Sequence, residues 1–239
     1  MGGHRPHCPS RHSQRSGYDG NMLAHFQSVI FDFDYTLADS SRAVVECANL
    51  ALRELDLPEQ PPETICRTIG LSIPNTLACL AGEEHRHRAG EFRMIWRRRS
   101  DEIMVEWTEV YPFVSGTLRA LRGCGLRLGI VSTKFNQRID EVLRREGLRD
   151  LFETIVGGDE VEHYKPHPQG LLKAIAHLDC NPEGTVYVGD SLTDAETAER
   201  AGAPFVAVLS GVTRREEFES FKSFRVLKNA GELPLHIGC

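Results

Sequence analysis

The chain of 239 residues carries a net charge of −6, with 41% apolar and 26% charged residues, values that are typical of a globular protein. The negative charge argues against binding to nucleic acid or to membrane surfaces, and no apolar run reaches the length of a membrane span. The seven cysteines are scattered and form no Cys-x-x-Cys pair, which favours a reducing cytoplasm over a disulfide framework or a zinc site. We therefore expect a cytoplasmic protein with one large core, or with a core and a smaller domain.

Residues 1–21 differ from the rest of the chain, since they are rich in Gly, Arg, His, Ser and Pro and nearly free of aliphatic residues. Such a composition buries too little apolar surface to fold, so we predict a flexible tail, with Met22 as a natural start of the protein. The segment holds four potential metal ligands: His4, His7, Cys8 and His12. We interpret them as part of the tail rather than as a metal site.

The first strand is predicted at Val29–Phe31, where β-branched and aromatic residues form a short apolar run. Asp32 and Asp34 follow it, and because side chains alternate, both would leave a straight continuation of the strand on the same side. Two carboxylates this close repel each other, and a divalent cation with oxygen ligands is the simplest group to offset the repulsion. The alternative is a solvated strand end with ordinary aspartate caps, so residues further along the chain must decide.

The stretch from residue 40 to residue 110 has the pattern of helices throughout, and Asp39-Ser40-Ser41 offers good helix N-cap chemistry at its start. The next strand-like run is Leu126–Val131, so this stretch interrupts an α/β domain just after its first strand. We predict a core formed by residues 22–39 and 111–239 and an inserted helical cap formed by residues 40–110. The alternative is a helical layer within a single domain.

Strands and helices alternate over the rest of the chain. The predicted strands are Leu126–Val131, Thr154–Val156, Thr185–Val188 and Phe205–Leu209. The predicted helices are Thr117–Arg122, one that Asn136 caps, Leu171–Leu178, Asp194–Gly202 and a charged helix after Arg214, before a weak last strand at Val226-Leu227. This order is typical of a doubly wound, mostly parallel, Rossmann-like sheet.

Polar side chains follow the ends of four predicted strands: Asp32 and Asp34, Ser132, Lys165 in the loop beyond the third strand, and Asp190 with Asp194. Ligands of open parallel sheets bind beyond the carboxyl ends of the strands, so we expect these residues around one crevice. Taken alone, each residue has a simpler interpretation: Ser132 as a turn residue or helix cap, Lys165 as a solvated lysine, and Asp190 as a helix cap. Together they allow phosphoryl transfer, because a carboxylate can attack phosphorus, Mg²⁺ screens phosphate charge, and a lysine and a hydroxyl hold phosphoryl oxygens.

Four motifs carry a resemblance to a known family: Asp32–Leu37, Gly129–Lys134, Lys165–Pro168 and Val188–Asp194. In this order, over residues 28–210, they resemble the haloacid dehalogenase-like hydrolase superfamily, and within it the phosphoglycolate phosphatase-like branch with a helical cap. The resemblance implies a Rossmann-like α/β core with an inserted, mobile all-helical cap that closes over the site and excludes water.

The resemblance also implies a role for each residue. Asp32 is expected to be the nucleophile and a Mg²⁺ ligand, and Asp34 to be the general acid and base, with a backbone carbonyl that also binds Mg²⁺. Asp190 is expected to bind Mg²⁺, with Asp194 helping directly or through water. The implied phosphate-binding groups are the hydroxyl of Ser132, the amide of Thr133 and the ammonium group of Lys165, which bridges nucleophile and phosphate.

These expectations describe a Mg²⁺-dependent phosphatase that hydrolyses a small phosphorylated metabolite, phosphoglycolate-like or a sugar phosphate, through an aspartyl-phosphate. Asp34 favours phosphate esters over dehalogenation, since a leaving oxygen needs a proton. The alternative with the same chemistry is a hexose-phosphate mutase of the β-phosphoglucomutase type. A signalling receiver domain is disfavoured, because it carries its phosphoacceptor Asp at the third strand, which here ends in Gly157-Gly158. We expect no nucleic acid and no membrane as partner, and a monomer or homodimer.

Three features of the predicted cap are candidate substrate contacts. Gly70-Leu71-Ser72 resembles the cap loop that faces the site in this branch, and Arg67 lies one helical turn before it. The three positions of Arg97-Arg98-Arg99 point in different directions on a helix, so at most one or two of these side chains face the cleft. Exposed charges on the cap surface are the favoured interpretation of Arg67 and of most of the arginine triplet.

Overall fold

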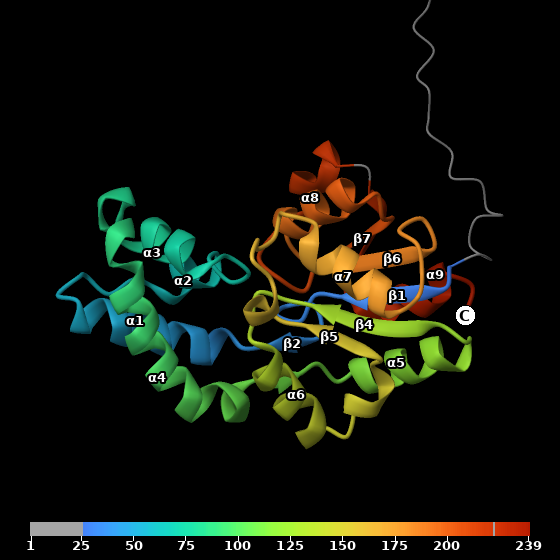
Figure 1. Ribbon diagram of the computed structural model, residues 1–239, viewed down its shortest axis with the longest axis horizontal. Helices are drawn as coiled ribbons and strands as arrows, with labels where there is room; N and C mark the ends of the chain where they lie inside the picture. Colours follow the sequence, from blue (N-terminus) through green and yellow to red (C-terminus); the bar gives the residue numbers. More distant parts are fainter. Residues whose placement is uncertain (1–25, 222) are drawn as a thin grey trace, which may run out of the picture.

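The computed structural model describes residues 26–221 and 223–239, so the predicted tail and its four potential metal ligands lie outside the described residues. The described chain forms an α/β core and a helical lobe beside it (Figure 1). None of the helices in these two ranges combines the length and the apolar character that spanning a bilayer requires.

The core is built on a six-stranded parallel sheet with the strand order β5-β4-β1-β6-β7-β8. Its strands are β1 (Ser28–Phe31), β4 (Arg127–Val131), β5 (Thr154–Val156), β6 (Thr185–Gly189), β7 (Phe205–Val208) and β8 (Ser223–Leu227). β1 lies inside the sheet, where Phe31 is in register with Ile130 of β4 and with Val188 of β6. The strand order changes direction beside β1, which confirms the predicted doubly wound, Rossmann-like sheet and makes its carboxyl edge the expected place for a site.

Helices cover both faces of the sheet: α5 (Val114–Gly123), α6 (Asn136–Arg145), α7 (Gln169–His177), α8 (Leu192–Ala201) and the short α9 (Leu233–His236). Side chains of β1 alternate between the two faces. Val29 and Phe31 pack with α5, α6 and α9, whereas Ile30 packs with α7 and α8. All three are fully buried, and burial of each such side chain contributes about 1.5–3 kcal/mol, which explains why an unbroken apolar run forms this strand.

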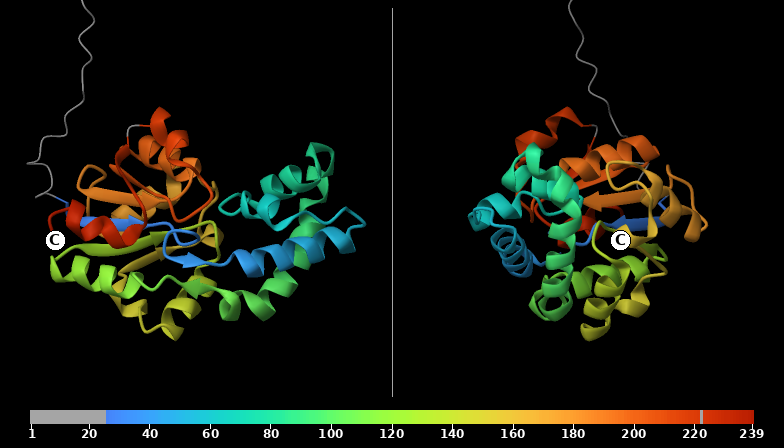
Figure 2. Two further views of the ribbon diagram at one scale, coloured as in Figure 1. Left: turned by 180° about the vertical axis from the view of Figure 1, so that it is seen from behind. Right: turned by 60° about the vertical axis from the view of Figure 1, so that its left-hand side comes forward.

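The helical lobe consists of α1 (Ser41–Glu54), α2 (Pro62–Cys66), α3 (Ile73–Ala81) and α4 (Ala89–Trp107), and it stands beyond one end of the sheet (Figure 2). It has an apolar cluster of its own, in which Leu52, Leu77 and Phe92 are fully buried. Two short strands, β2 (Ala38–Asp39) and β3 (Glu109–Val110), pair antiparallel where the chain leaves and re-enters the core. The helical insertion is therefore present, while the domain limits at residues 40 and 110 stay a prediction.

One local prediction is wrong. Asn136 does not cap α6 but is its first residue, after Phe135, because the carboxylate of Asp159 accepts the hydrogen bond from the Asn136 amide at 2.9 Å. The charged helix predicted after Arg214 is present as a 3₁₀-helix, Arg215–Ser220. The weak last strand is present as β8, paired with β7.

Candidate active site

Three neighbouring strands are each followed by a buried polar side chain at the same edge of the sheet. Asp32 follows β1, Ser132 follows β4 and Asp190 follows β6, and none of them is more than 5% exposed. Lys165 reaches this edge from the loop between β5 and α7, and Asp194 from the first turn of α8. The parallel register therefore gathers residues that are up to 162 positions apart, from Asp32 to Asp194, into one site.

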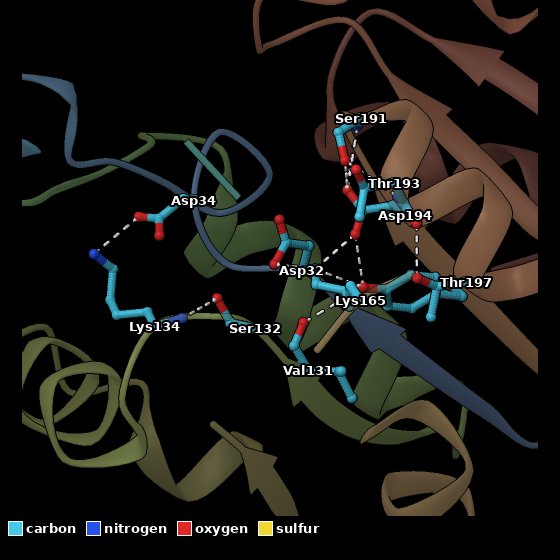
Figure 3. Close-up of polar contacts among 11 residues, drawn as sticks. Asp32, Asp34, Val131, Ser132, Lys134, Lys165, Ser191, Thr193, Asp194 and Thr197 are labelled. Atoms are coloured by element: carbon cyan, nitrogen blue, oxygen red, sulfur yellow. Dashed lines mark hydrogen bonds and ion pairs between the residues drawn. The ribbon is translucent and has the colours of Figure 1, made fainter. Parts of the chain in front are cut away.

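Three carboxylates and one ammonium group form the centre of this site, and Figure 3 shows Asp32, Asp194 and Lys165 of this group. The carboxylates of Asp32, Asp190 and Asp194 have oxygen atoms within 4.8 Å of one another, and all three residues are buried. Lys165 Nζ donates hydrogen bonds to Asp32 Oδ1 at 2.8 Å and to Asp194 Oδ1 at 2.6 Å. We call these four residues the carboxylate cluster.

Burial shifts the pKa values in the carboxylate cluster. It raises the pKa of Asp32 to about 7, a shift that Lys165 opposes and Asp194 reinforces. Burial also raises the pKa of Asp190 well above its usual range, with added repulsion from Asp194 and Asp32. For Lys165, burial alone lowers the pKa, but the attraction of Asp194 and Asp32 prevails and holds this pKa well above its usual range. One ammonium group thus faces three carboxyl groups in this buried site.

The donor set of the carboxylate cluster fits a Mg²⁺ ion. Oxygen atoms of Asp32, Asp190 and Asp194 are close enough together to bind one small cation. Mg²⁺ prefers hard oxygen ligands and takes part of its coordination from one or two carboxylates. A divalent cation also supplies the positive charge that Lys165 alone does not provide.

The hydrogen bonds of Ser191 and Tyr187 fix the side chain of Asp194. Ser191 Oγ accepts from the Asp194 amide at 3.2 Å and the Ser191 amide donates to Asp194 Oδ2 at 3.2 Å, which is a capping box at the start of α8. Ser191 Oγ also donates to Asp194 Oδ2 at 2.5 Å. The hydroxyl of Tyr187, a fully buried residue of β6, lies 2.8 Å from Asp194 Oδ1 and 3.0 Å from Lys165 Nζ. Sequence reasoning missed both residues, although a tyrosine inside a buried strand is itself a signal, because its hydroxyl needs a partner.

The carboxylate of Asp34 lies apart from the carboxylate cluster (Figure 3). It accepts a hydrogen bond from the Ser40 hydroxyl at 2.6 Å and forms an ion pair with Lys134 Nζ at 3.3 Å. The two acids of the first motif do not continue a straight strand, because β1 ends before them and the chain turns, with Tyr35 in the left-handed conformation at φ 59°. Metal binding through the backbone carbonyl of Asp34 stays a prediction.

The three expected phosphate-binding residues share one small cavity. Ser132, Thr133 and Lys165 all line it, next to the end of β4. Ser132 Oγ accepts a hydrogen bond from the amide of Lys134 at 3.2 Å, which orders the turn that carries the hydroxyl. The roles of these residues stay predictions, but their side chains do come together.

A larger cavity opens between the two lobes. Asp34, Thr133 and Lys134 line it from the core, and Gly70-Leu71-Ser72 and Arg97 line it from the helical lobe. Of the described residues, those of the carboxylate cluster do not belong to its lining. The cavity therefore extends from the Asp34 side of the site, and we call it the interlobe cavity.

The three consecutive arginines of α4 have different surroundings, as helix geometry predicts. Within the triplet, Arg97 alone lines the interlobe cavity, whereas Arg98 pairs with Glu54 at 2.5 Å and Arg99 pairs with Glu46 at 3.0 Å. Both pairs lie on the surface of the lobe, which agrees with the interpretation of most of the triplet as surface charge.

Two glycines allow the backbone to approach the carboxylates of Asp190 and Asp194. A Cβ atom at Gly211 would lie 1.9 Å from Asp190 Oδ2, and one at Gly189 would lie 2.5 Å from the side chain of Asp194. Any side chain at either position would displace a carboxylate of the cluster. Sequence reasoning also missed Gly211, because its neighbours Ser210 and Val212 carry no charge that marks the loop as part of the site.

Comparison with curated proteins identifies relatives that share most of the chain. A phosphoglycolate phosphatase from Salmonella typhi is 32% identical over 212 residues, which cover 80% of this chain and 84% of that protein. A phosphoglycolate phosphatase from Aquifex aeolicus is 32% identical, with 78% of this chain and 86% of that protein covered. A pyrophosphatase PpaX from Bacillus mycoides is 30% identical, with 86% and 94% covered.

Comparison with solved structures agrees with these relatives. A haloacid dehalogenase-like hydrolase from Bacteroides fragilis superposes with a TM-score of 0.84 and 38% identity, covering 87% of this chain and 99% of that one. Residues 29–208 match the family described as haloacid dehalogenase-like hydrolase. The expected family is thereby confirmed, with phosphoglycolate phosphatases among the relatives: this chain is an enzyme of the haloacid dehalogenase-like hydrolase family.

Proposed function

We propose that the protein is a Mg²⁺-dependent phosphatase that hydrolyses a small phosphorylated metabolite through an aspartyl-phosphate on Asp32. The observation that carries this proposal is the buried contact of Lys165 with Asp32 and Asp194, beside Asp190 and Ser132. The residues that we propose as nucleophile, phosphate-binding group and metal ligands thus lie together at one edge of the sheet. The names of the relatives, phosphoglycolate phosphatase and pyrophosphatase, support phosphate esters or anhydrides as substrates.

In this proposal the phosphoryl group lies between the carboxylate cluster and the end of β4. Lys165 and the Ser132 hydroxyl hold its oxygens, together with the amide of Thr133. Asp32, Asp190 and Asp194 would hold Mg²⁺, with the carbonyl of Asp34 as a further ligand. Bound there, Mg²⁺ neutralises charge on the phosphoryl oxygens and stabilises the transition state.

The reaction then takes two steps. In the first, an Asp32 oxygen forms a bond to phosphorus, the bond from phosphorus to the ester oxygen breaks, and Asp34 gives a proton to that oxygen. In the second, Asp34 takes a proton from water, the water oxygen attacks the same phosphorus, and the bond to Asp32 breaks, which releases phosphate and restores both acids. The helical lobe would exclude bulk water while the first step proceeds.

Release of inorganic phosphate from p-nitrophenyl phosphate and from 2-phosphoglycolate tests the proposal. We expect hydrolysis with Mg²⁺, loss of it with EDTA and recovery when Mg²⁺ is added back. Asp32→Asn, a nearly isosteric change, should abolish turnover and keep the melting temperature. Full activity of Asp32→Asn, or of metal-free protein, would exclude the proposed chemistry, and transfer of phosphate to a hexose phosphate without its release would point to the mutase.

A further inference from the structure

The interlobe cavity lies where the leaving group of the substrate belongs. Asp34, which the proposed function makes the proton donor to the leaving oxygen, lines this cavity. The carboxylate cluster, which holds the phosphoryl group in the same proposal, is not part of the lining among the described residues. The room in the cavity therefore serves the part of the substrate beyond the ester oxygen, so this inference rests on the proposed function.

The cavity is too apolar for a two-carbon acid. Apolar and aromatic side chains from both lobes line it and are only half-buried: Ile69, Leu71, Ile73, Trp96, Phe135 and Tyr164. A glycolate leaving group has almost no apolar surface with which to cover them, whereas a ring covers several at once and makes favourable contacts with aromatic side chains.

The cavity also carries positive charge that no acid of the described chain fully neutralises. Arg93, Arg97 and Arg138 line it. Asp101 pairs with Arg138 at 2.6 Å and lies 3.8 Å from Arg97, so one carboxylate serves two guanidinium groups. Arg93 has no hydrogen bond or ion pair with any residue in 26–221 and 223–239. Guanidinium groups without a carboxylate partner of their own bind carboxylate or phosphate groups of a ligand.

We propose that the interlobe cavity binds a leaving group that combines an aromatic ring with a negative charge, and that the substrates are phosphate esters of this class rather than of two-carbon acids. The ring covers the apolar side chains of both lobes, beside Trp96 and Phe135. The negative charge pairs with Arg93, and the leaving oxygen faces Asp34.

Three primary-alcohol esters separate the two features: 2-phosphoglycolate has the charge without the ring, benzyl phosphate has the ring without the charge, and 4-carboxybenzyl phosphate has both. We expect kcat/KM for 4-carboxybenzyl phosphate to exceed that of each of the others by about ten-fold or more. Arg93→Ala should lower the ratio of 4-carboxybenzyl to benzyl phosphate by about ten-fold, the value of one hydrogen bond to a charged group. Arg98→Ala is the matched control, because Arg98 is on the same helix, is paired with Glu54 and lies outside the cavity lining.

Two results would overturn the proposal: a kcat/KM for 2-phosphoglycolate equal to or above that of 4-carboxybenzyl phosphate, or a charge preference that Arg93→Ala and Arg98→Ala change equally. Hydrolysis of none of the three esters with Mg²⁺ is a different result, because it contradicts the proposed function. In that case, calorimetry would measure the affinity of each intact ester for the wild-type protein. Tightest binding of 4-carboxybenzyl phosphate would support the inference, and equal or tighter binding of 2-phosphoglycolate would overturn it.

Discussion

Lys134 Nζ lies 3.3 Å from the Asp34 carboxylate, and both side chains are more than nine-tenths buried. The same nitrogen lies 3.4 Å from Ser40 Oγ and 3.3 Å from Met104 Sδ. Ser40 in turn donates to Asp34 at 2.6 Å. The expected general acid is thus held by a residue of the second motif, by the segment that leads into α1, and indirectly by α4 of the helical lobe.

Lys134→Met should therefore impair proton transfer more than phosphoryl binding. Without the ion pair the Asp34 carboxylate loses its fixed orientation. In the first step, which kcat/KM reports, only substrates whose leaving oxygen needs a proton depend on Asp34. We expect kcat/KM for benzyl phosphate to fall about ten-fold more than kcat/KM for p-nitrophenyl phosphate, since general acid catalysis contributes about 10²–10⁴-fold. Lys173→Met is the control, because Lys173 pairs with Glu160 away from the site. Equal losses on both esters would mean that Lys134 does not act through Asp34.

Tyr187→Phe should weaken catalysis while the fold is kept. The change removes one oxygen that contacts Lys165 Nζ at 3.0 Å and Asp194 Oδ1 at 2.8 Å, and leaves the buried ring in place. Loss of a residue that orients a metal ligand typically costs about 10–100-fold in metal affinity or activity, so we expect a loss in this range, seen in kcat and in the Mg²⁺ activation constant. Thr117→Val in α5 is the control, since it also removes one hydroxyl, which here donates to the Phe113 carbonyl away from the carboxylate cluster. If both variants behaved alike, Tyr187 would be a packing residue only.

The sequence predicted the residues of the carboxylate cluster because their convergence follows from topology. Once Asp32 and Asp190 are placed after parallel strands, the shared carboxyl edge brings them together, whatever the details of the loops. The side-chain direction of Asp34 was not predictable in this way, because it depends on the left-handed turn at Tyr35. The Lys134 contact with Ser40 spans 94 positions between two lobes, and no local pattern encodes such a pairing.

Mg²⁺ binding should strengthen as pH rises. Burial raises the pKa of Asp32 to about 7 without metal, so at lower pH a proton competes with the cation for this carboxylate. The pKa of Asp32 is about 7 in the metal-free fold and near 3.8 in the unfolded chain, so the fold binds this proton more tightly. Protonated Asp32 therefore stabilises the metal-free fold at low pH, and this stabilisation is lost as pH rises from about 4 to about 7. Mg²⁺ offsets that loss. We expect the difference in melting temperature between Mg²⁺ and EDTA samples to widen from about pH 5 to about pH 8, and a constant difference would contradict the proposed ligand role of Asp32.

Gly211→Ala should lower Mg²⁺ affinity although it changes none of the proposed metal ligands. The new Cβ would lie 1.9 Å from Asp190 Oδ2, well inside van der Waals contact, so the carboxylate or the loop must move. A shift of this kind moves one ligand relative to the other two, and we expect the Mg²⁺ activation constant to rise about ten-fold or more. Gly116→Ala in α5 is the matched control, because nothing lies within 4 Å of a Cβ there, and the change should raise stability by about 0.5–1 kcal/mol and leave Mg²⁺ activation as it is. An unchanged activation constant in Gly211→Ala would mean that Asp190 is free to rotate away, and that its position beside Asp32 and Asp194 is not the one that binds the metal.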